Sequence, residues 1–288
     1  MKLVRYGAPG REKPGVIDAE GTLRDLSRKV ADIDGAALAP SSLTALRKLD
    51  TRRLPVVKGR PRLGPCIATP SKFIAIGLNY IDHAKETGAP IPEYPVVFFK
   101  AQTCIVGAND NIMQPMDSTQ LDWEVELGVV IGRMARHVTS KDALRYVAGY
   151  CIVNDVSERE FQMKRSASQW SKGKGCDTFG PIGPWLVTAD EIKDPRNLGM
   201  WLDVNGTRRQ TGNTRTMIFG VAEVVADLSR YMTLLPGDII TTGTPPGVAM
   251  GMKPPQWLKP GDIVTLGIDG LGEQRQRVVA FSNRRRVA

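Results

Sequence analysis

The sequence predicts an α+β protein in which β-strands predominate, with a small α/β domain over residues 1–66 and a larger domain over residues 67–288. Apolar, strand-like runs recur along the second segment, and they do not alternate with helices as a parallel α/β sheet requires. A stretch rich in proline and arginine, residues 59–65, separates the two parts. A length of 288 residues is sufficient for one large and one small domain.

The N-terminal part contains three predicted strands and a helix. Residues 2–6 alternate between apolar and polar side chains, as a half-buried strand does. Residues 15–18 and 23–26 flank the turn-like sequence 19–22, which predicts a hairpin. Residues 41–49 begin with serine and continue with leucines at helical spacing, so they predict a short helix.

The larger part is dominated by predicted strands. Two of them follow a Pro-Gly-Asp turn that leads into β-branched residues. Helices are expected at residues 141–147, 157–169 and 218–231, and the last has a stripe of valine and leucine at helical spacing. The strands are expected at residues 73–77, 96–100, 124–131, 149–154, 183–187, 202–204, 238–241 and 262–266.

Composition indicates a soluble globular protein that stays in the cytoplasm. Apolar residues make up 42% and charged residues 24% of the chain, and no apolar run approaches the length that crosses a membrane. The N-terminus lacks the apolar segment of a signal peptide. The four cysteines are widely spaced without a C-x-x-C pair, which favours reduced thiols over disulfides or a zinc site.

The formal net charge is +9, and part of it lies in Arg284, Arg285 and Arg286. We interpret this run as a solvated terminus. Nucleic-acid binding is not expected, because no recognition motif or interleaved aromatic residues accompany the arginines. A positive charge also favours small organic acids as substrates, because the field concentrates anions.

The strongest chemical signal is a set of three carboxylates. Residues 122–127 read Asp-Trp-Glu-Val-Glu-Leu, and in a strand Glu124 and Glu126 point to the same side. Asp155 follows a second apolar strand that includes residues 150–153. Burying neighbouring carboxylates is costly unless a cation compensates them. Three carboxylates with waters suit a hard divalent ion such as Mg²⁺.

Two further segments carry candidate catalytic groups. If residues 80–87 form a short helix, His83 and Glu86 share a face, and the carboxylate can orient the imidazole for general base catalysis. The alternative is that His83 is a surface residue. Lys174 lies between glycines, so it could bind a carboxylate or an enolate oxygen, unless the segment is an exposed flexible loop.

Three other polar features have plainer interpretations. Asp122 is expected to flank the glutamates without being a fourth ligand. His137 lies in a basic loop and is expected to be solvated. Residues 242–248 are rich in glycine and proline, which on spacing alone indicates a turn.

Six ordered motifs together resemble the fumarylacetoacetate hydrolase family over about residues 70–282. Each is modest alone, and their order and spacing make the resemblance specific. They are Gly-Leu-Asn-Tyr-x-x-His-x-x-Glu at 77–86, Phe-Phe-Lys at 98–100, Trp-Glu-Val-Glu-Leu at 123–127, Asn-Asp-Val-Ser-Glu-Arg-x-x-Gln at 154–162, Lys-Gly-Cys-Asp-Thr-Phe-Gly-Pro-x-Gly-Pro at 174–184 and Thr-Gly-Thr-Pro-x-Gly-Val at 242–248.

The resemblance implies a metal centre and a water-activating pair. Glu124, Glu126 and Asp155 would hold Mg²⁺, or Mn²⁺ or Ca²⁺ in its place. His83 and Glu86 would activate water from a lid segment that orders when substrate binds. The family fold is a mixed β-roll, often with a small N-terminal domain, and the usual assembly is a homodimer.

The resemblance also implies substrate contacts. Lys174 would stabilise a developing enolate, Arg159 and Gln162 would contact the substrate, and Thr244 would bind its carboxylate. The chain departs from many members at Gly175-Cys176, where a pair such as Ser-Phe is common. This difference alters the packing near Lys174 and leaves the shape of the pocket open.

Within the family, the chain looks most like bacterial hydrolases of 2,4-diketo-3-deoxy sugar acids such as the L-fuconate derivative, whose relatives include proteins labelled ureidoglycolate lyase. The expected reaction is hydrolysis of the C3–C4 bond of a 2,4-dioxo acid to pyruvate and a second acid. The alternatives are ureidoglycolate lyase, 2-hydroxyhepta-2,4-diene-1,7-dioate isomerase and 2-oxo-diacid decarboxylase activity on the same metal site. A family resemblance does not decide among them. A metal-binding relative without activity is a further alternative.

Overall fold

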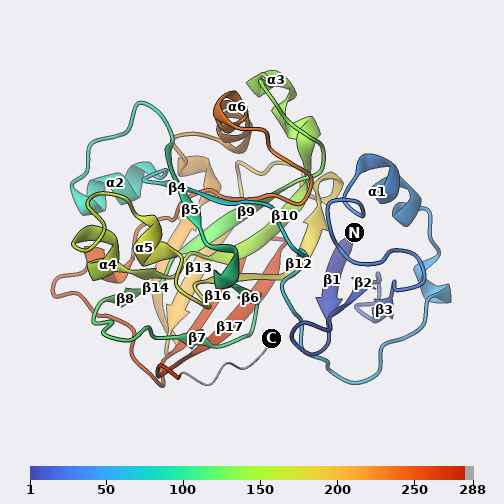
Figure 1. The fold of residues 1–288 in the computed structure, drawn as a ribbon, viewed down its shortest axis with the longest axis horizontal. Helices are drawn as coiled ribbons and strands as arrows, with labels where there is room; N and C mark the ends of the chain where they lie inside the picture. Colours follow the sequence, from blue (N-terminus) through green and yellow to red (C-terminus); the bar gives the residue numbers. More distant parts are fainter. Residues whose placement is uncertain (283–288) are drawn as a thin grey trace.

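The computed structural model describes residues 1–282 and is dominated by two β-sheets (Figure 1). The larger is a mixed sheet of ten strands, and it confirms the predicted β-rich α+β class. Its strands, in spatial order, are β3 (Leu23–Asp25), β2 (Lys13–Ile17), β1 (Lys2–Tyr6), β12 (Gly180–Thr188), β10 (Val147–Asn154), β9 (Val125–Ile131), β15 (Ile239–Thr241), β4 (Phe73–Gly77) and β5 (Val96–Lys100), and β6 (Ile105–Gly107) pairs with β12.

The second sheet has five strands and packs against the first. Strands β9, β10 and β12 contact strands of this smaller sheet, and the apolar core lies between the two layers. A separate two-stranded sheet pairs β11 (Ser157–Glu158) with β8 (Leu121–Asp122). The five strands, in spatial order, are β14 (Thr207–Asn213), β13 (Gly199–Val204), β16 (Ile263–Ile268), β17 (Gly272–Val279) and β7 (Ile112–Met113).

The N-terminal strands extend the large sheet. The predicted hairpin forms β2 and β3, and β1 pairs antiparallel with β12, with Lys2 opposite Val187. Helix α1 (Pro40–Arg47) forms where a helix is expected and buries Leu43 and Leu46. The sheet therefore runs through both parts of the chain, and the division at residue 66 stays a prediction.

The central strands β9 and β10 are buried on both faces. All seven residues of β9 and all eight of β10 are buried, which explains why both read as nearly continuous apolar runs. Their antiparallel register places Val153 opposite Glu126 and Asn154 opposite Val125. The end of β10 therefore lies directly beside the start of β9.

Helices α2 (Ile81–Thr87), α4 (Arg159–Met163) and α5 (Ser171–Lys174) lie near one another at the left of Figure 1, whereas α3 (Ser140–Ala143) and α6 (Val221–Tyr231) lie at the top. Helix α2 forms as expected, and α6 buries the predicted stripe of valine and leucine. None of the helices within residues 1–282 has the length and apolar character needed to cross a membrane.

Two of the predicted helices are wrong in extent. The segment 157–169 is not one helix: β11 comes first, then the Glu158 side chain caps α4 by accepting from Phe161 N at 2.7 Å. Ala167 and Ser168 have φ angles of 46° and 70°, so a helix cannot continue through them. The segment 141–147 gives only α3 and a 3₁₀ turn, because Val147 already belongs to β10.

Candidate active site

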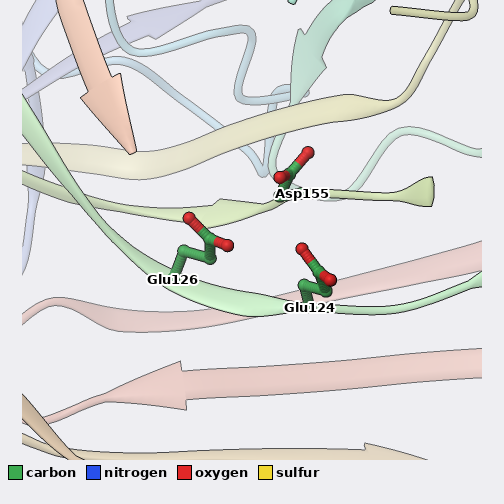
Figure 2. Close-up of side chains that lie close together, drawn as sticks. All are labelled: Glu124, Glu126 and Asp155. Carbon is green, nitrogen blue, oxygen red and sulfur yellow. The ribbon is translucent and has the colours of Figure 1, made fainter. Parts of the chain in front are cut away.

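The three predicted carboxylates meet in the interior. Glu124, Glu126 and Asp155 are 4%, 2% and 1% exposed, and one oxygen of each lies within 4.8 Å of the others. Figure 2 shows the three side chains facing a common space. The pairing of β9 with β10 causes this, because the Asp155 amide continues the ladder by donating to the Glu124 carbonyl at 2.9 Å.

Lysine and arginine side chains neutralise two of the carboxylates. Lys174 Nζ lies 2.6 Å from Glu124 Oε2 and 2.8 Å from Asp155 Oδ2. Arg159 Nη2 lies 2.5 Å from Glu124 Oε1. Burial alone would raise the pKa of Glu124, but Lys174 and Arg159 outweigh it and hold that pKa far below its usual value. Burial alone would lower the pKa of Lys174, but Asp155 and Glu124 raise it, so the ammonium stays charged.

Glu126 has no such partner. Its Oε2 accepts from Thr241 Oγ1 at 2.5 Å and from Gly243 N at 2.8 Å, and no ion pair to it forms within residues 1–282. Burial raises the pKa of Glu126 well above its ordinary value, and repulsion from Asp155 and Glu124 raises it further. A divalent cation among the three carboxylates would supply the missing positive charge. The donor set is oxygen only, so these residues fit Mg²⁺, Mn²⁺ or Ca²⁺.

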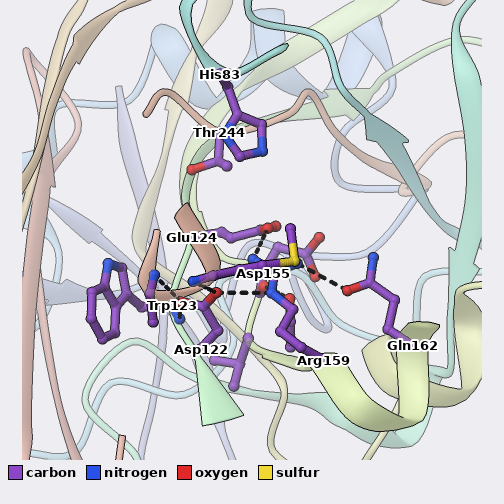
Figure 3. Close-up of polar contacts among 12 residues, drawn as sticks. His83, Asp122, Trp123, Glu124, Asp155, Arg159, Gln162 and Thr244 are labelled. Carbon is purple, nitrogen blue, oxygen red and sulfur yellow. Dashed lines mark hydrogen bonds and ion pairs between the residues drawn. The ribbon is translucent and has the colours of Figure 1, made fainter. Parts of the chain in front are cut away.

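Arg159 is held from three sides. Its Nε donates to Asp122 Oδ2 at 2.8 Å, and Nη1 donates to Gln162 Oε1 at 2.9 Å (Figure 3). Asp122 also accepts from the amides of Ala249 and Met250 at 2.7 and 3.1 Å. Asp122 is therefore no member of the carboxylate cluster, as expected. It orients Arg159 and connects it to the loop that carries Met250.

The expected pair of His83 and Glu86 forms on α2. His83 is 5% exposed, and its Nδ1 lies 2.9 Å from Glu86 Oε2. Glu86 Oε1 accepts from Gly247 N at 2.8 Å. A Cβ atom on Gly251 would lie 2.5 Å from Glu86 Cδ, so the absence of a side chain there lets α2 pack closely on this loop. His83 is buried, so the alternative of a surface histidine is excluded.

One cavity of about 630 Å³ contains these groups. Apolar walls come from Phe98, Met163, Trp170, Met250 and Met252, and Lys85 and Lys253 lie on its lining without an ion pair within residues 1–282. The predicted site residues on the lining are His83, Glu86, Glu124, Glu126, Asp155, Arg159, Gln162, Lys174 and Thr244.

Thr244 qualifies the role that the resemblance implies for it, and Cys176 adds no reactive group to the site. Thr244 lines the cavity, but its hydroxyl donates to the Val125 carbonyl at 3.0 Å and accepts from Gln210 at 2.8 Å. Binding a carboxylate would require this hydroxyl to turn. Burial raises the pKa of Cys176 to about 11, so its thiol stays protonated near neutral pH and is no nucleophile.

The remaining sequence-based expectations concern basic residues. His137 is exposed, as expected for a basic loop, whereas Lys174 is 2% exposed and belongs to α5, so the flexible-loop alternative is excluded. The arginine run 284–286 lies outside the described residues. Sequence reasoning missed Lys100, which is buried beside Asp155; the Phe-Phe-Lys motif was its only signal.

Comparison with known proteins identifies the family. The family model described as "Fumarylacetoacetate (FAA) hydrolase C-terminal" matches residues 72–279. The chain belongs to the fumarylacetoacetate hydrolase family. A Burkholderia ambifaria protein, provisionally named a hydrolase, is 61% identical over 277 residues, which is 96% of this chain and 98% of the relative.

Solved structures of this family share the fold over nearly the whole chain. A 5-carboxymethyl-2-hydroxymuconate delta-isomerase from Mycobacterium smegmatis is 33% identical with a TM-score of 0.74, covering 98% of this chain and 100% of the other. A maleylpyruvate hydrolase from Sphingobium sp. SYK-6, in complex with manganese(II) and pyruvate, is 28% identical with a TM-score of 0.80 and the same coverage. The chain is therefore an enzyme of a family that contains hydrolases and isomerases.

Proposed function

We propose that this family member is a metal-dependent hydrolase that cleaves the C3–C4 bond of a 2,4-dioxo acid to pyruvate and a second acid. The observation that carries the proposal is the shared cavity. It brings the His83–Glu86 pair, which can activate water, to the same space as three carboxylates and a buried lysine. The structurally similar maleylpyruvate hydrolase was solved in complex with manganese(II) and pyruvate, which supports a divalent metal and a pyruvate product for this chain.

The residues that would hold the metal are Glu124, Glu126 and Asp155. A bound Mg²⁺, Mn²⁺ or Ca²⁺ would supply Lewis acidity toward the carboxylate and 2-oxo group of the substrate. Gln162 Oε1 accepts from Arg159, which leaves the amide nitrogen to donate to the substrate. The cavity-lining Lys85 and Lys253 favour an anionic substrate, in line with a small 2-oxo acid.

The chain's own groups can move the proton. Glu86 holds Nδ1 of His83, so Nε2 is the nitrogen that takes a proton from water as the water attacks the C4 carbonyl. When the C3–C4 bond breaks, its electrons pass to the pyruvate fragment as an enolate. The charged Lys174 ammonium stabilises that enolate, and the proton held by His83 returns to C3.

Isotope labelling of the second product tests this reaction against its alternatives. We expect that acetylpyruvate incubated with the enzyme and Mg²⁺ in water enriched in oxygen-18 gives pyruvate, and acetate that carries at least one heavy oxygen. Mass spectrometry of the acetate measures this. Pyruvate without labelled acetate would contradict hydrolysis. If acetylpyruvate is inert, turnover of oxaloacetate to pyruvate, of ureidoglycolate, or of an unsaturated oxo-diacid to its isomer would instead establish decarboxylase, lyase or isomerase activity.

Assembly and location remain proposals. We propose a homodimer in the cytoplasm, because the family resemblance implies this assembly. The cysteines Cys66, Cys104, Cys151 and Cys176 are all free, which agrees with a reducing compartment.

A further inference from the structure

Lys100 is a fully buried cation that the proposed chemistry does not use. It ends β5, where it pairs with Phe73 of β4, and its side chain is 0% exposed. It is not among the residues that line the cavity. Burying an ammonium is costly unless it is paired and hydrogen-bonded, so the partners of Lys100 indicate its role.

All three N–H donors of Lys100 have acceptors at the site. Nζ lies 2.5 Å from Asp155 Oδ1, contacts the carbonyl oxygen of Lys174, and lies 3.4 Å from the carbonyl oxygen of Val156. One side chain from β5 therefore holds the carboxylate at the end of β10 and the last residue of α5. These segments are 55 and 74 residues away in the sequence.

Lys100 and Lys174 hold opposite oxygens of Asp155. Lys174 takes Oδ2 and bridges it to Glu124, so a cation that enters the cluster competes with Lys174 for its acceptors. Lys100 takes Oδ1 and contacts no other carboxylate of the cluster. Lys100 can therefore keep the orientation of Asp155 fixed while Oδ2 exchanges Lys174 for a cation.

Lys100 also completes the support of Lys174. Helix α5 packs so closely on α4 that a Cβ on Gly173 would lie 2.4 Å from the backbone nitrogen of Gln162. Lys100 donates to the backbone carbonyl of Lys174. The backbone that carries Lys174 is thus fixed between α4 and β5.

We propose that Lys100 is a positioning residue for the metal centre. It fixes Asp155 in the orientation that shares a divalent cation with Glu124 and Glu126, and it fixes the backbone of Lys174. This inference rests on the metal centre of the proposed function. Groups that orient metal ligands typically contribute about 10- to 100-fold to metal affinity or activity.

The test compares two variants that each remove a lysine from a buried carboxylate. Lys100→Met removes the contact to Asp155. Lys72→Met is the matched control, because Lys72 Nζ lies 2.7 Å from Asp238, which is 0% exposed and belongs to no part of the site. Mn²⁺ binding to each protein is measured without substrate, from the electron paramagnetic resonance signal of free Mn²⁺.

We expect Lys100→Met to bind Mn²⁺ about 10- to 100-fold more weakly than wild type, while Lys72→Met binds it like wild type. Unchanged or tighter binding by folded Lys100→Met would overturn the proposal. If that variant does not fold, Lys100→Gln replaces it: this side chain keeps one donor for Asp155, and it should weaken Mn²⁺ binding less than tenfold but more than twofold. Wild-type affinity in Lys100→Gln would also overturn the proposal. If wild type binds Mn²⁺ but cleaves no acylpyruvate, the proposed function fails while the affinity comparison still decides the role of Lys100.

Discussion

Glu126→Ala is expected to abolish metal binding and to reduce activity by about a thousandfold or more. Glu126 is one of three metal ligands in the proposed site, and within residues 1–282 it is the one that forms no ion pair with a lysine or arginine. Lewis acid catalysis by a bound metal contributes several kcal/mol, and each 1.4 kcal/mol or so corresponds to a factor of ten in rate.

The fold should survive this substitution. Removing Glu126 leaves Thr241 Oγ1 and Gly243 N without their acceptor, which costs about 1–3 kcal/mol for each buried group. It also removes the repulsion from Asp155 and Glu124. Calorimetric titration with Mn²⁺ and thermal unfolding followed by circular dichroism measure the two effects separately. A folded Glu126→Ala protein that still turns over substrate would refute the metal assignment.

His83→Ala is the second substitution with a large expected effect. Loss of a positioned general base typically costs about 100- to 10,000-fold in rate, so hydrolysis of an acylpyruvate should fall by that factor. Decarboxylation of oxaloacetate on the same site should be retained, because it needs no activated water. Parallel assays with both substrates, which share pyruvate as a product, measure the loss of hydrolysis relative to the loss of decarboxylation.

The second histidine provides the matched control. His137 is exposed in a loop away from the cavity, so His137→Ala should leave both rates unchanged. Unchanged hydrolysis in His83→Ala would refute the role of the His83–Glu86 pair. Equal loss of both activities would show that His83 acts on a step that the two reactions share.

The central strands could be predicted from the sequence because strands buried in the interior consist almost entirely of apolar residues. The expected strands 73–77 and 96–100 coincide with β4 and β5, and the buried faces of β9 and β10 account for their apolar runs. The carboxylates at the ends of those runs stand out against the apolar background. Their meeting in space is confirmed by the structure, whereas the metal itself stays a prediction.

Strand β17 escaped prediction because its inward side chains are polar. Gln274 and Gln276 are buried, whereas Glu273, Arg275 and Arg277 point to solvent, so the segment lacks the usual alternation of apolar and polar residues. The buried glutamines are satisfied by partners distant in sequence, such as the Ile152 carbonyl, which accepts from Gln274 at 2.9 Å. Contacts between residues so distant in sequence cannot be predicted from a local sequence pattern.

The supporting contacts of the site could not be predicted for the same reason. Lys100 contacts Asp155 across 55 residues, and Asp122 contacts Arg159 across 37. Spacing in a single sequence shows which residues share a face of one element. It does not show which elements become neighbours in a mixed sheet of ten strands.

Metal-dependent cleavage is tested most directly by pyruvate release from a simple acylpyruvate, with Mg²⁺ and with EDTA, followed by a coupled lactate dehydrogenase assay. We expect pyruvate formation with Mg²⁺, its loss in EDTA, and its return when Mg²⁺ is restored in excess. Pyruvate formation that persists in EDTA would contradict the metal mechanism. A folded, metal-loaded protein that releases no pyruvate would contradict acylpyruvate hydrolysis.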